Sequence, residues 1–380
     1  MKSPLRLFPF TLFAALGCAG TLHGAAAPDD EARFLAGLPV PYTALESLSR
    51  SPAWAAHAAE FDSDWAELEK RQLAPIADWA PKAIGHFYTD DTPVIYFFSG
   101  PDFLYAHAFF PKASTYILCG IEPIGPLPQV EDLPPETLAG SLATLRDSMG
   151  SVLDFSFFIT KKMRVQLVQD SRLSGTLPLL YVFLARAGCH IDDVSFTGVD
   201  AKGQITAGRT LAPAVKIVFD GPGGKVQTLY YFSTDLSDGP IERSGFLKWV
   251  AGFAPGHGLL KAASYLMHSS GFDTTRQFLL GNCDGILQDD SGIPVRYFPI
   301  NDWDVHLFGD YQGPIETFKQ YLQPEINQLK AVQKPAPLDF SVGYRWHPGQ
   351  SSLILAIKAH HANAPEATPA PPATTPSPQP

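Results

Sequence analysis

Residues 92–123 read TPVIYFFSGPDFLYAHAFFPKASTYILCGIEP, and this stretch decides the fold class of the chain. Its first seven residues are apolar and rich in strand-forming types, and they end at the turn SGPD of residues 99–102. A helical segment follows over 103–110, and a second strand pattern runs from Thr115 to Leu118. A strand, a tight turn, a short helix and a strand make a βαβ unit, so we expect two parallel neighbouring strands.

The sequence on both sides of this unit predicts helices and hairpins around a mixed sheet. Ser51 and Pro52 are typical of the N-cap and first position of a helix, and apolar residues then recur at three- and four-residue steps up to Leu68. We predict an α/β fold with α+β character: a mixed sheet with an N-terminal Rossmann-like βαβ element, antiparallel hairpins and flanking helices. The other expected elements are helices in 30–85, 134–187, 245–280 and 314–332, hairpins in 194–206 and 215–232, and strands at 294–298, 304–308, 340–345 and 352–357.

The first 26 residues predict a secretory signal peptide. Lys2 and Arg6 form a short positive region, an apolar run follows over 5–16, and small residues precede a cleavage site after Ala26. Cys18 offers an alternative, because the sequence ALGC that it ends is similar to a bacterial lipoprotein box in which the cysteine is lipidated. In either case we expect an exported protein, periplasmic or secreted, or else anchored to the membrane as a lipoprotein.

The remaining chain divides into a body and a tail. Residues 27–361 are continuous in composition and predict a single globular α/β domain, with no later segment apolar enough for a transmembrane helix. Residues 362–380 contain seven prolines and no large apolar residue. Such a segment cannot bury enough surface to offset its ordering entropy, so we predict a disordered tail rich in Pro, Ala and Thr.

Charge and cysteine content exclude some classes of partner. Without Lys2 and Arg6, 26 of the 28 basic residues remain against 38 acidic ones, a net charge of −12. This charge argues against a nucleic-acid partner and against docking on anionic lipid, so membrane attachment would require lipidation. Cys119, Cys189 and Cys283 are far apart without a Cys-x-x-Cys pair, which disfavours zinc. They are either three buried thiols or one disulfide and one free thiol.

Four residues at the ends of the two predicted parallel strands are candidates for binding a ligand: Ser99, Gly100, Asp102 and Glu122. The turn stands where a Rossmann-like fold holds its ligand, and Glu122 stands where such folds place a ribose-binding acid. The layout is similar to the first βαβ of nucleotide- or S-adenosylmethionine-binding folds. It departs from them because Gly-x-Gly-x-x-Gly is absent and Pro101 lacks an amide for a phosphate. The alternative is a fold-forming turn in which Asp102 caps the helix.

A second polar cluster lies within residues 284–310. Alternate residues of a strand share one face, so Asp302, Asp304 and His306 would converge and could bind Zn²⁺ or Ca²⁺. The cluster could also supply an acid and a base, with Arg296 paired to a carboxylate. The alternative is a set of polar turns between short strands. The catalytic candidates are Asp289, Asp290, Arg296, Asp304 and His306, and the metal candidates are Asp302, Asp304 and His306.

Several stretches resemble an uncharacterised family of exported bacterial proteins with no assigned activity. These stretches are residues 99–111 and 120–123, and residues 287–294 and 308–311. The resemblance would cover most of the chain after the signal peptide. It implies export and a shared fold, and it implies no chemistry.

The sequence favours binding over catalysis. It lacks a complete catalytic motif, including the Gly-x-Ser-x-Gly elbow, so we predict a non-catalytic binding protein of the cell envelope and no cofactor. Its partner would be an envelope protein or a glycan, with Trp303, Tyr311, Tyr344 and Trp346 as candidate groove residues. One alternative is an extracytoplasmic hydrolase that uses the cluster in 284–310, with or without a divalent metal. The other is a Rossmann-like module that binds a nucleotide-like ligand.

Overall fold

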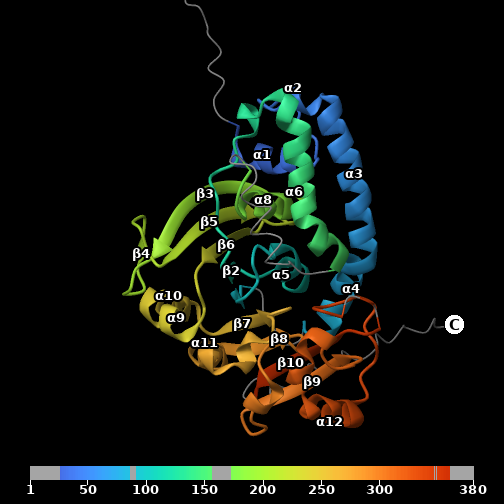
Figure 1. Ribbon diagram of the computed structural model, residues 1–380, viewed down its shortest axis with the longest axis vertical. Coiled ribbons are helices and arrows are strands. Elements are labelled where there is room, and N and C mark those ends of the chain that lie inside the picture. The colour runs from blue at the N-terminus through green and yellow to red at the C-terminus, as the bar shows by residue number, and fades with distance from the viewer. Residues whose placement is uncertain (1–25, 86–90, 156–172, 346, 348, 360–380) are drawn as a thin grey trace, which may run out of the picture.

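The computed structural model describes residues 26–85, 91–155, 173–345, 347 and 349–359. In this part of the chain ten strands form one mixed sheet, in the order β4-β3-β5-β6-β2-β1-β7-β8-β10-β9. Helices pack against the sheet, which confirms the predicted α/β class (Figure 1). Residues 1–25 of the predicted signal peptide, with Cys18, and the predicted tail lie outside the described residues.

The bounds of the elements are as follows. The strands are β1 (Val94–Tyr96), β2 (Thr115–Gly120), β3 (His190–Val199), β4 (Ile205–Thr206), β5 (Ala212–Asp220), β6 (Val226–Ser233), β7 (Gly256–Leu260), β8 (Cys283–Gln288), β9 (Trp303–Gly309) and β10 (Ser352–Lys358). The helices are α1 (Pro28–Leu35), α2 (Glu46–Ser49), α3 (Pro52–Leu68), α4 (Ala74–Ala83), α5 (Phe103–Phe109), α6 (Pro135–Phe155), α8 (Leu177–Arg186), α9 (Asp238–Ser244), α10 (Phe246–Val250), α11 (Asp273–Asn282) and α12 (Pro324–Gln333).

Five neighbouring strands are parallel, with β1 in the middle. Val94 of β1 is level with Tyr116 of β2 on one side and with His257 of β7 on the other, and β6 and β8 extend the parallel set. The βαβ unit predicted from the sequence is therefore confirmed. Across the sheet these strands come third, second, first, fourth and fifth along the chain, which is the order of doubly wound α/β folds. The order reverses between β1 and β7, so their carboxyl ends form the topological switch point.

β1 is buried on both faces of the sheet, which explains its unbroken apolar sequence. Val94 and Tyr96 pack in a core shared with α3, α5 and α8, whereas Ile95 packs in a second core with Phe246 of α10. Figure 1 shows α1, α2, α3 and α6 at one end of the molecule and β8, β10, β9 and α12 at the other.

The predicted N-terminal helix is confirmed with its cap. Ser51 Oγ accepts a hydrogen bond of 3.2 Å from the Trp54 amide, and Pro52 occupies the first helical position of α3. Phe61 and Leu68 are buried on the side of α3 that faces the core. The same helix packs along α6, which covers this end of the sheet (Figure 1).

The hairpins predicted in the middle of the chain are confirmed as the antiparallel pairs β3–β4 and β5–β6. The strands predicted at 304–308 and 352–357 are confirmed as β9 and β10, which pair antiparallel to each other.

Other predictions of local structure are wrong. The segment 245–280 was expected to be helical, yet it contains the central strand β7 between α10 and α11, and β8 was not predicted at all. The strand predicted at 294–298 is a 3₁₀ turn, and 340–345 contributes an isolated bridge between Val342 and Arg345. Burial between two strands overrides the weak strand propensity of the glycines in β7 and β8.

Two further properties follow from the described residues. Within these ranges no helix is both long and apolar enough to cross a bilayer. Cys119, Cys189 and Cys283 are free and buried, as in the first of the two alternatives drawn from the sequence.

Candidate functional site

A buried ion pair joins the two loops at the switch point. Lys261, directly after β7, places its Nζ 2.9 Å from Oδ2 of Asp102, which follows β1, and the two side chains are 1% and 2% exposed. Tyr96 donates a hydrogen bond of 2.8 Å to the same oxygen, and the Tyr105 amide donates one of 3.2 Å to Oδ1. Burial raises the pKa of Asp102, and Lys261 opposes that shift. Asp102 therefore caps α5, and both of its oxygens have partners within the protein.

The other three ligand candidates, Ser99, Gly100 and Glu122, follow β1 and β2. Ser99 Oγ donates to the Gly100 carbonyl at 2.8 Å and accepts from the Cys119 amide at 3.1 Å, so its hydroxyl fastens the end of β1 to β2. Glu122 is buried and its Oε2 accepts a hydrogen bond of 3.3 Å from the Tyr231 hydroxyl. A Cβ on Gly100 would lie 3.6 Å from Glu122 Oε2. The fold thus brings Gly100 and Glu122 together. Ser99 and Asp102 serve internal contacts, and Glu122 Oε2 also has one internal partner, the Tyr231 hydroxyl.

Asp289, the first residue after β8, fastens neighbouring loops. Its Oδ1 accepts the amide and hydroxyl of Ser291 at 3.0 and 2.5 Å, and its Oδ2 accepts the Ala262 amide at 2.9 Å. Burial raises its pKa. Gly343 lies so close that a Cβ there would stand 1.8 Å from Asp289 Oδ2, and its φ is +65°. Asp289 thereby connects the loop after β7 to the segment around 343.

Asp290 differs from Asp289 because it is partly exposed and has fewer partners. Its Oδ2 accepts a hydrogen bond of 2.7 Å from the Tyr265 hydroxyl, and its backbone carbonyl accepts one of 2.9 Å from Gln323. Burial, together with the charge of Asp289, raises the pKa of Asp290 to about 7, against the opposing effect of Tyr265 and Arg345. A carboxyl group whose pKa is raised by burial and by a neighbouring acid, and which lies beside a strand end, is a candidate for function.

Backbone strain is concentrated in the loops at the switch point. Of the seven non-glycine residues with positive φ in the described ranges, four lie in these loops: Phe98, Ala262, Ser264 and Tyr265. Each such residue costs about 1–2 kcal/mol relative to a relaxed conformation, so the surroundings must hold it. Tyr344 does so after β7, because its hydroxyl donates to the Ala262 carbonyl at 2.9 Å and accepts the Ser264 amide at 3.1 Å.

The predicted catalytic residues do not all come together. Asp304 and His306 share a face of the edge strand β9 and form a pair of 3.1 Å, with side chains 51% and 45% exposed. His306 is level with Leu355 of β10, which is level with Leu287 of β8, so His306 lies two strands away from the β8 end. Arg296 lies over the Tyr297 ring at 5.0 Å. Asp289 and Asp290 are neighbours, whereas Asp304 and His306 lie away from them on β9. Arg296 belongs to the 295–297 turn, where the Val295 amide donates to Gln323, the same side chain that bonds the Asp290 carbonyl.

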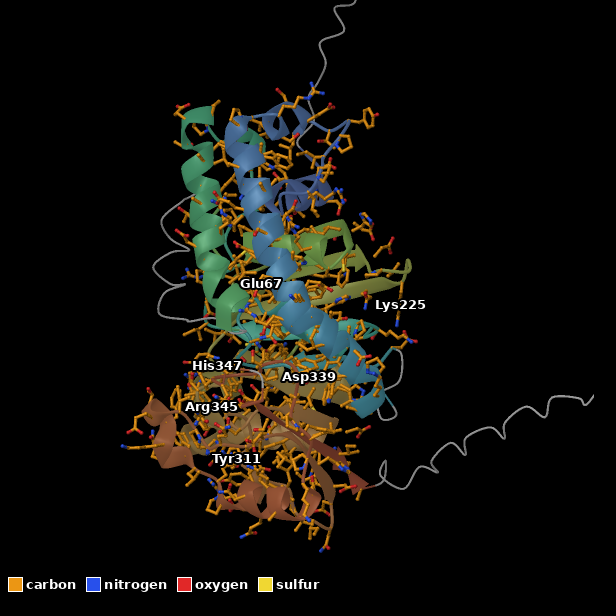
Figure 2. All side chains as sticks on the ribbon, turned by 90° about the vertical axis from the view of Figure 1, so that its right-hand side faces the viewer. Glu67, Lys225, Tyr311, Asp339, Arg345 and His347 are labelled. Carbon is orange, nitrogen blue, oxygen red and sulfur yellow. The ribbon has the colours of Figure 1, made fainter. Side chains whose placement is uncertain are left out.

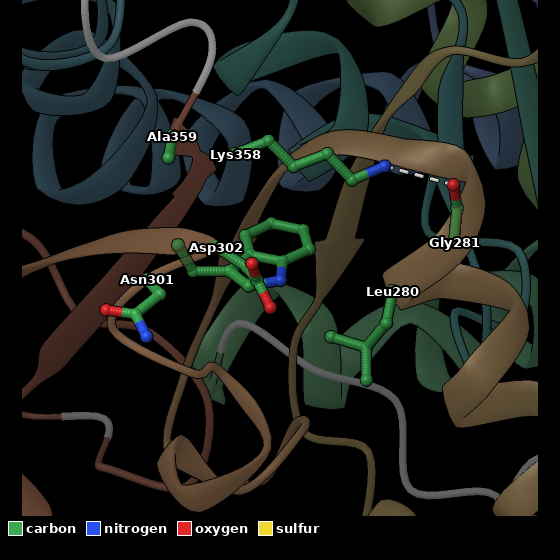
Figure 3. A pocket seen from close by; sticks show the side chains of 7 residues that line it. Leu280, Gly281, Asn301, Asp302, Lys358 and Ala359 are labelled. Atoms are coloured by element: carbon green, nitrogen blue, oxygen red, sulfur yellow. Dashed lines mark hydrogen bonds between the residues drawn. The ribbon is translucent and has the colours of Figure 1, made fainter.

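The predicted metal set also receives no support from the described residues. These residues contain no group of three or more His, Cys, Asp or Glu side chains arranged to hold a metal ion. Asp302 lies in the turn before β9 and lines a cavity of about 470 Å³ at the opposite, amino edge of β8 (Figure 3). There Lys358 donates a hydrogen bond of 3.0 Å to the Gly281 carbonyl. Trp303, a predicted groove residue, lines the same cavity but is buried.

Sequence reasoning missed Lys261, Tyr96 and Tyr265. Lys261 lies in a segment expected to be helical, where a single lysine carries no signal. Recognition of 256–260 as a strand would have placed Lys261 at a carboxyl end and marked it as a candidate. Tyr344 and Tyr311, two predicted groove residues, do lie on this side of the molecule, where Figure 2 shows Tyr311 and Arg345 in the half formed by the last third of the chain. Trp346, the fourth, is outside the described residues.

Comparison with known proteins identifies no relative: no protein-family model, no curated protein and no solved structure matches the chain. The resemblance to exported bacterial proteins stays a prediction.

Proposed function

We propose that the protein is an extracytoplasmic binding protein that holds a small polar ligand at the carboxyl edge of its parallel strands. The site would extend from Glu122, past the Lys261–Asp102 pair, to Asp290. Ligands of open α/β sheets bind at this edge, at the point where the strand order reverses. The extracytoplasmic location is the one predicted from the N-terminal sequence.

One observation carries the proposal: strain and buried charge coincide at the switch point. The loops after β1 and β7 contain four of the seven strained non-glycine residues of the described ranges, and the buried Lys261–Asp102 pair joins these loops. Both features cost free energy, and both are typical of sites kept for function rather than stability. The His306–Asp304 pair on the edge strand β9, by contrast, is exposed.

A nucleoside-type ligand is a second candidate, because Glu122 lies beside Gly100 next to β1. This placement and the strand order favour the Rossmann-like hypothesis more than the sequence alone did. Along this edge Lys261, the lysine of the buried pair, is held by Asp102, and the partly exposed side chain beyond it is the carboxyl group of Asp290. A phosphate would meet a carboxyl group there and a lysine that already has an acidic partner, which favours a nucleoside or S-adenosylmethionine over a dinucleotide.

A ligand panel followed by melting temperature tests the proposal on the full chain. The panel consists of adenosine, S-adenosylmethionine, NAD, soluble tetrasaccharides, Ca²⁺ and Zn²⁺. A ligand present at a hundred times its Kd stabilises the native state by about 2.7 kcal/mol, which a melt resolves. We expect a shift that Asp290→Asn or Glu122→Gln abolishes and that Asp304→Asn, the matched exposed control, leaves intact.

The outcomes of the ligand panel distinguish a site at the carboxyl edge from a site on β9. Loss of the shift in Glu122→Gln alone would favour the nucleoside candidate. A shift that survives in both carboxyl-edge variants but disappears in Asp304→Asn would overturn the proposal and restore the hydrolase hypothesis at β9. A panel without any shift would count against a small-ligand site at the carboxyl edge.

A further inference from the structure

A cluster of aromatic rings lies at one end of the proposed site. It is formed by Tyr265 and His268 after β7, Phe318 and Tyr321 in the 3₁₀ segment Glu316–Tyr321, and Tyr344. Tyr265 stacks on Tyr321 at 5.0 Å between centroids with the planes 6° apart, and on Tyr344 at 6.2 Å and 14°. Phe318 contacts Tyr344 at 5.0 Å. We call these five residues the aromatic cluster.

The aromatic cluster is built on one buried ring and opens to solvent through the others. Tyr265 is fully buried, whereas Phe318, Tyr321 and Tyr344 are partly exposed. The Tyr344 hydroxyl is hydrogen-bonded to the Ala262 carbonyl and to the Ser264 amide. These bonds hold the strained backbone at Ser264 and Tyr265, and so fix the position of the central Tyr265 ring. Partly exposed rings on a rigid base provide flat apolar surface at little cost in conformational entropy.

Polar groups that can bind a neutral ligand surround these rings. Asp290 meets the cluster through the Tyr265 hydroxyl, and no other side chain of the described residues is hydrogen-bonded to its carboxyl group. The exposed Ser264 hydroxyl lies 2.8 Å from the Tyr344 hydroxyl. The Arg345 guanidinium is held by carbonyls, donating to Gly313 at 2.8 Å and to Pro314 at 3.1 Å. The cluster therefore combines ring faces with a carboxyl, a hydroxyl and a cation.

This combination selects among ligand classes. A phosphate would face the carboxyl group of Asp290. An aliphatic chain would remove water from Asp290, Ser264 and Arg345 without replacing the hydrogen bonds that water makes there. A sugar ring satisfies both kinds of surface, because its C–H face packs on an aromatic ring and its hydroxyls donate to a carboxyl group.

We propose that the aromatic cluster and Asp290 form a carbohydrate subsite, so that the ligand of the carboxyl edge is an oligosaccharide. The sugar face stacks on Tyr321, and a hydroxyl donates to Asp290. This inference rests on the proposed function and names its ligand class.

Isothermal titration of the full chain with cellotetraose, maltotetraose and chitotetraose tests the inference. We expect at least one to bind, and Tyr321→Ala to weaken that binding at least about tenfold, the loss of one stacked ring. Tyr321→Phe keeps the ring and retains binding, which separates stacking from the hydroxyl. Asp290→Asn weakens binding by a similar factor. Tyr42→Ala, which removes an exposed tyrosine ring from the loop before α2, serves as the matched control and leaves affinity unchanged.

The outcomes distinguish this inference from the proposed function. If none of the three tetrasaccharides binds while adenosine or S-adenosylmethionine does, the carbohydrate subsite is wrong and the carboxyl-edge site stands. If a tetrasaccharide binds equally well to Tyr321→Ala and to Asp290→Asn, the subsite is also wrong. If neither sugars nor the other panel compounds bind, both proposals fail. Melting curves of each variant establish that it remains folded.

Discussion

The protein contains two acid–base pairs of nearly the same length in very different surroundings. Lys261 Nζ lies 2.9 Å from Asp102 Oδ2 at the carboxyl edge, and the side chains are 1% and 2% exposed. His306 Nε2 lies 3.1 Å from Asp304 Oδ2 on the edge strand β9, where the side chains are 45% and 51% exposed. Because the N–O distances of the two pairs are nearly equal, the difference in burial decides what each pair contributes to stability and function.

The two pairs differ in the free energy that desolvation of their charges costs. A buried ion loses several kcal/mol of solvation, which is recovered only through close partners, and Asp102 has three of them. An exposed pair in water contributes little, because solvent screens it and its side chains lose entropy. The first pair is therefore a fixed part of the carboxyl edge, whereas the second can be changed without affecting that edge.

The largest effect is expected from Lys261→Met. Removal of the lysine leaves Asp102 charged and buried, so we expect the free energy of unfolding to fall by about 3–5 kcal/mol. Urea unfolding at neutral pH measures this loss. The double variant Lys261→Met with Asp102→Asn removes the stranded charge and should recover part of the loss. A loss below about 1 kcal/mol would mean that the pair is no more important than an exposed one.

The second effect is a pH dependence set by Asp290. Its pKa is raised to about 7, so its contribution to stability is greatest below the ordinary value of 3.8 and is lost as the pH rises toward 7. Asp290→Asn lacks this titration and should become more stable relative to the natural protein across that range. The full shift of about 3 pKa units corresponds to about 4 kcal/mol at about 1.4 kcal/mol per unit, and most of it, about 3 kcal/mol, should develop between pH 4 and 7.

Urea unfolding at several pH values between 4 and 7 follows this gain. Glu31 provides the matched control, because burial also raises its pKa to about 7 but it lies in α1. Glu31→Gln should change the pH slope in the same direction and leave ligand binding intact. Parallel stability curves for Asp290→Asn and the natural protein would show that Asp290 does not titrate near neutrality.

A smaller effect is expected from Gly343→Ala. The new Cβ would meet Asp289 Oδ2, and the positive φ adds strain, so we expect a loss of about 2–3 kcal/mol. Gly349→Ala is the control, because Gly349 also has a positive φ but nothing lies within 4 Å of its Cβ position. Its loss should stay near 1 kcal/mol, the cost of strain alone. Thermal unfolding compares the two variants. Equal losses of stability in Gly343→Ala and Gly349→Ala would contradict the close contact between Gly343 and Asp289.

The smallest effect is expected at β9. His306→Ala removes one member of an exposed pair, so the free energy of unfolding should change by less than about 1 kcal/mol. Ligand binding at the carboxyl edge should be unchanged. A loss of several kcal/mol, or a loss of binding, would show that the comparison between the two pairs is wrong.

The comparison also explains which parts of the structure the sequence could predict. The βαβ unit was predictable because Val94 to Phe98 is apolar on both faces, and Asp304 and His306 stand at a strand period that is visible locally. Lys261 and Asp102 meet only through the pairing of β1 with β7. That strand was missed because His257 lies between two glycines, a pattern without strand propensity. Long-range pairing therefore decides the site, and no local pattern encodes it.

Hydrogen–deuterium exchange of the full chain, with and without the panel compound that most raises the melting temperature, tests the central claim most directly. We predict slower exchange in residues 97–102, 262–265 and 289–293, the loops that follow β1, β7 and β8. Slower exchange confined to residues 303–309, with those loops unchanged, would contradict a ligand site at the carboxyl edge.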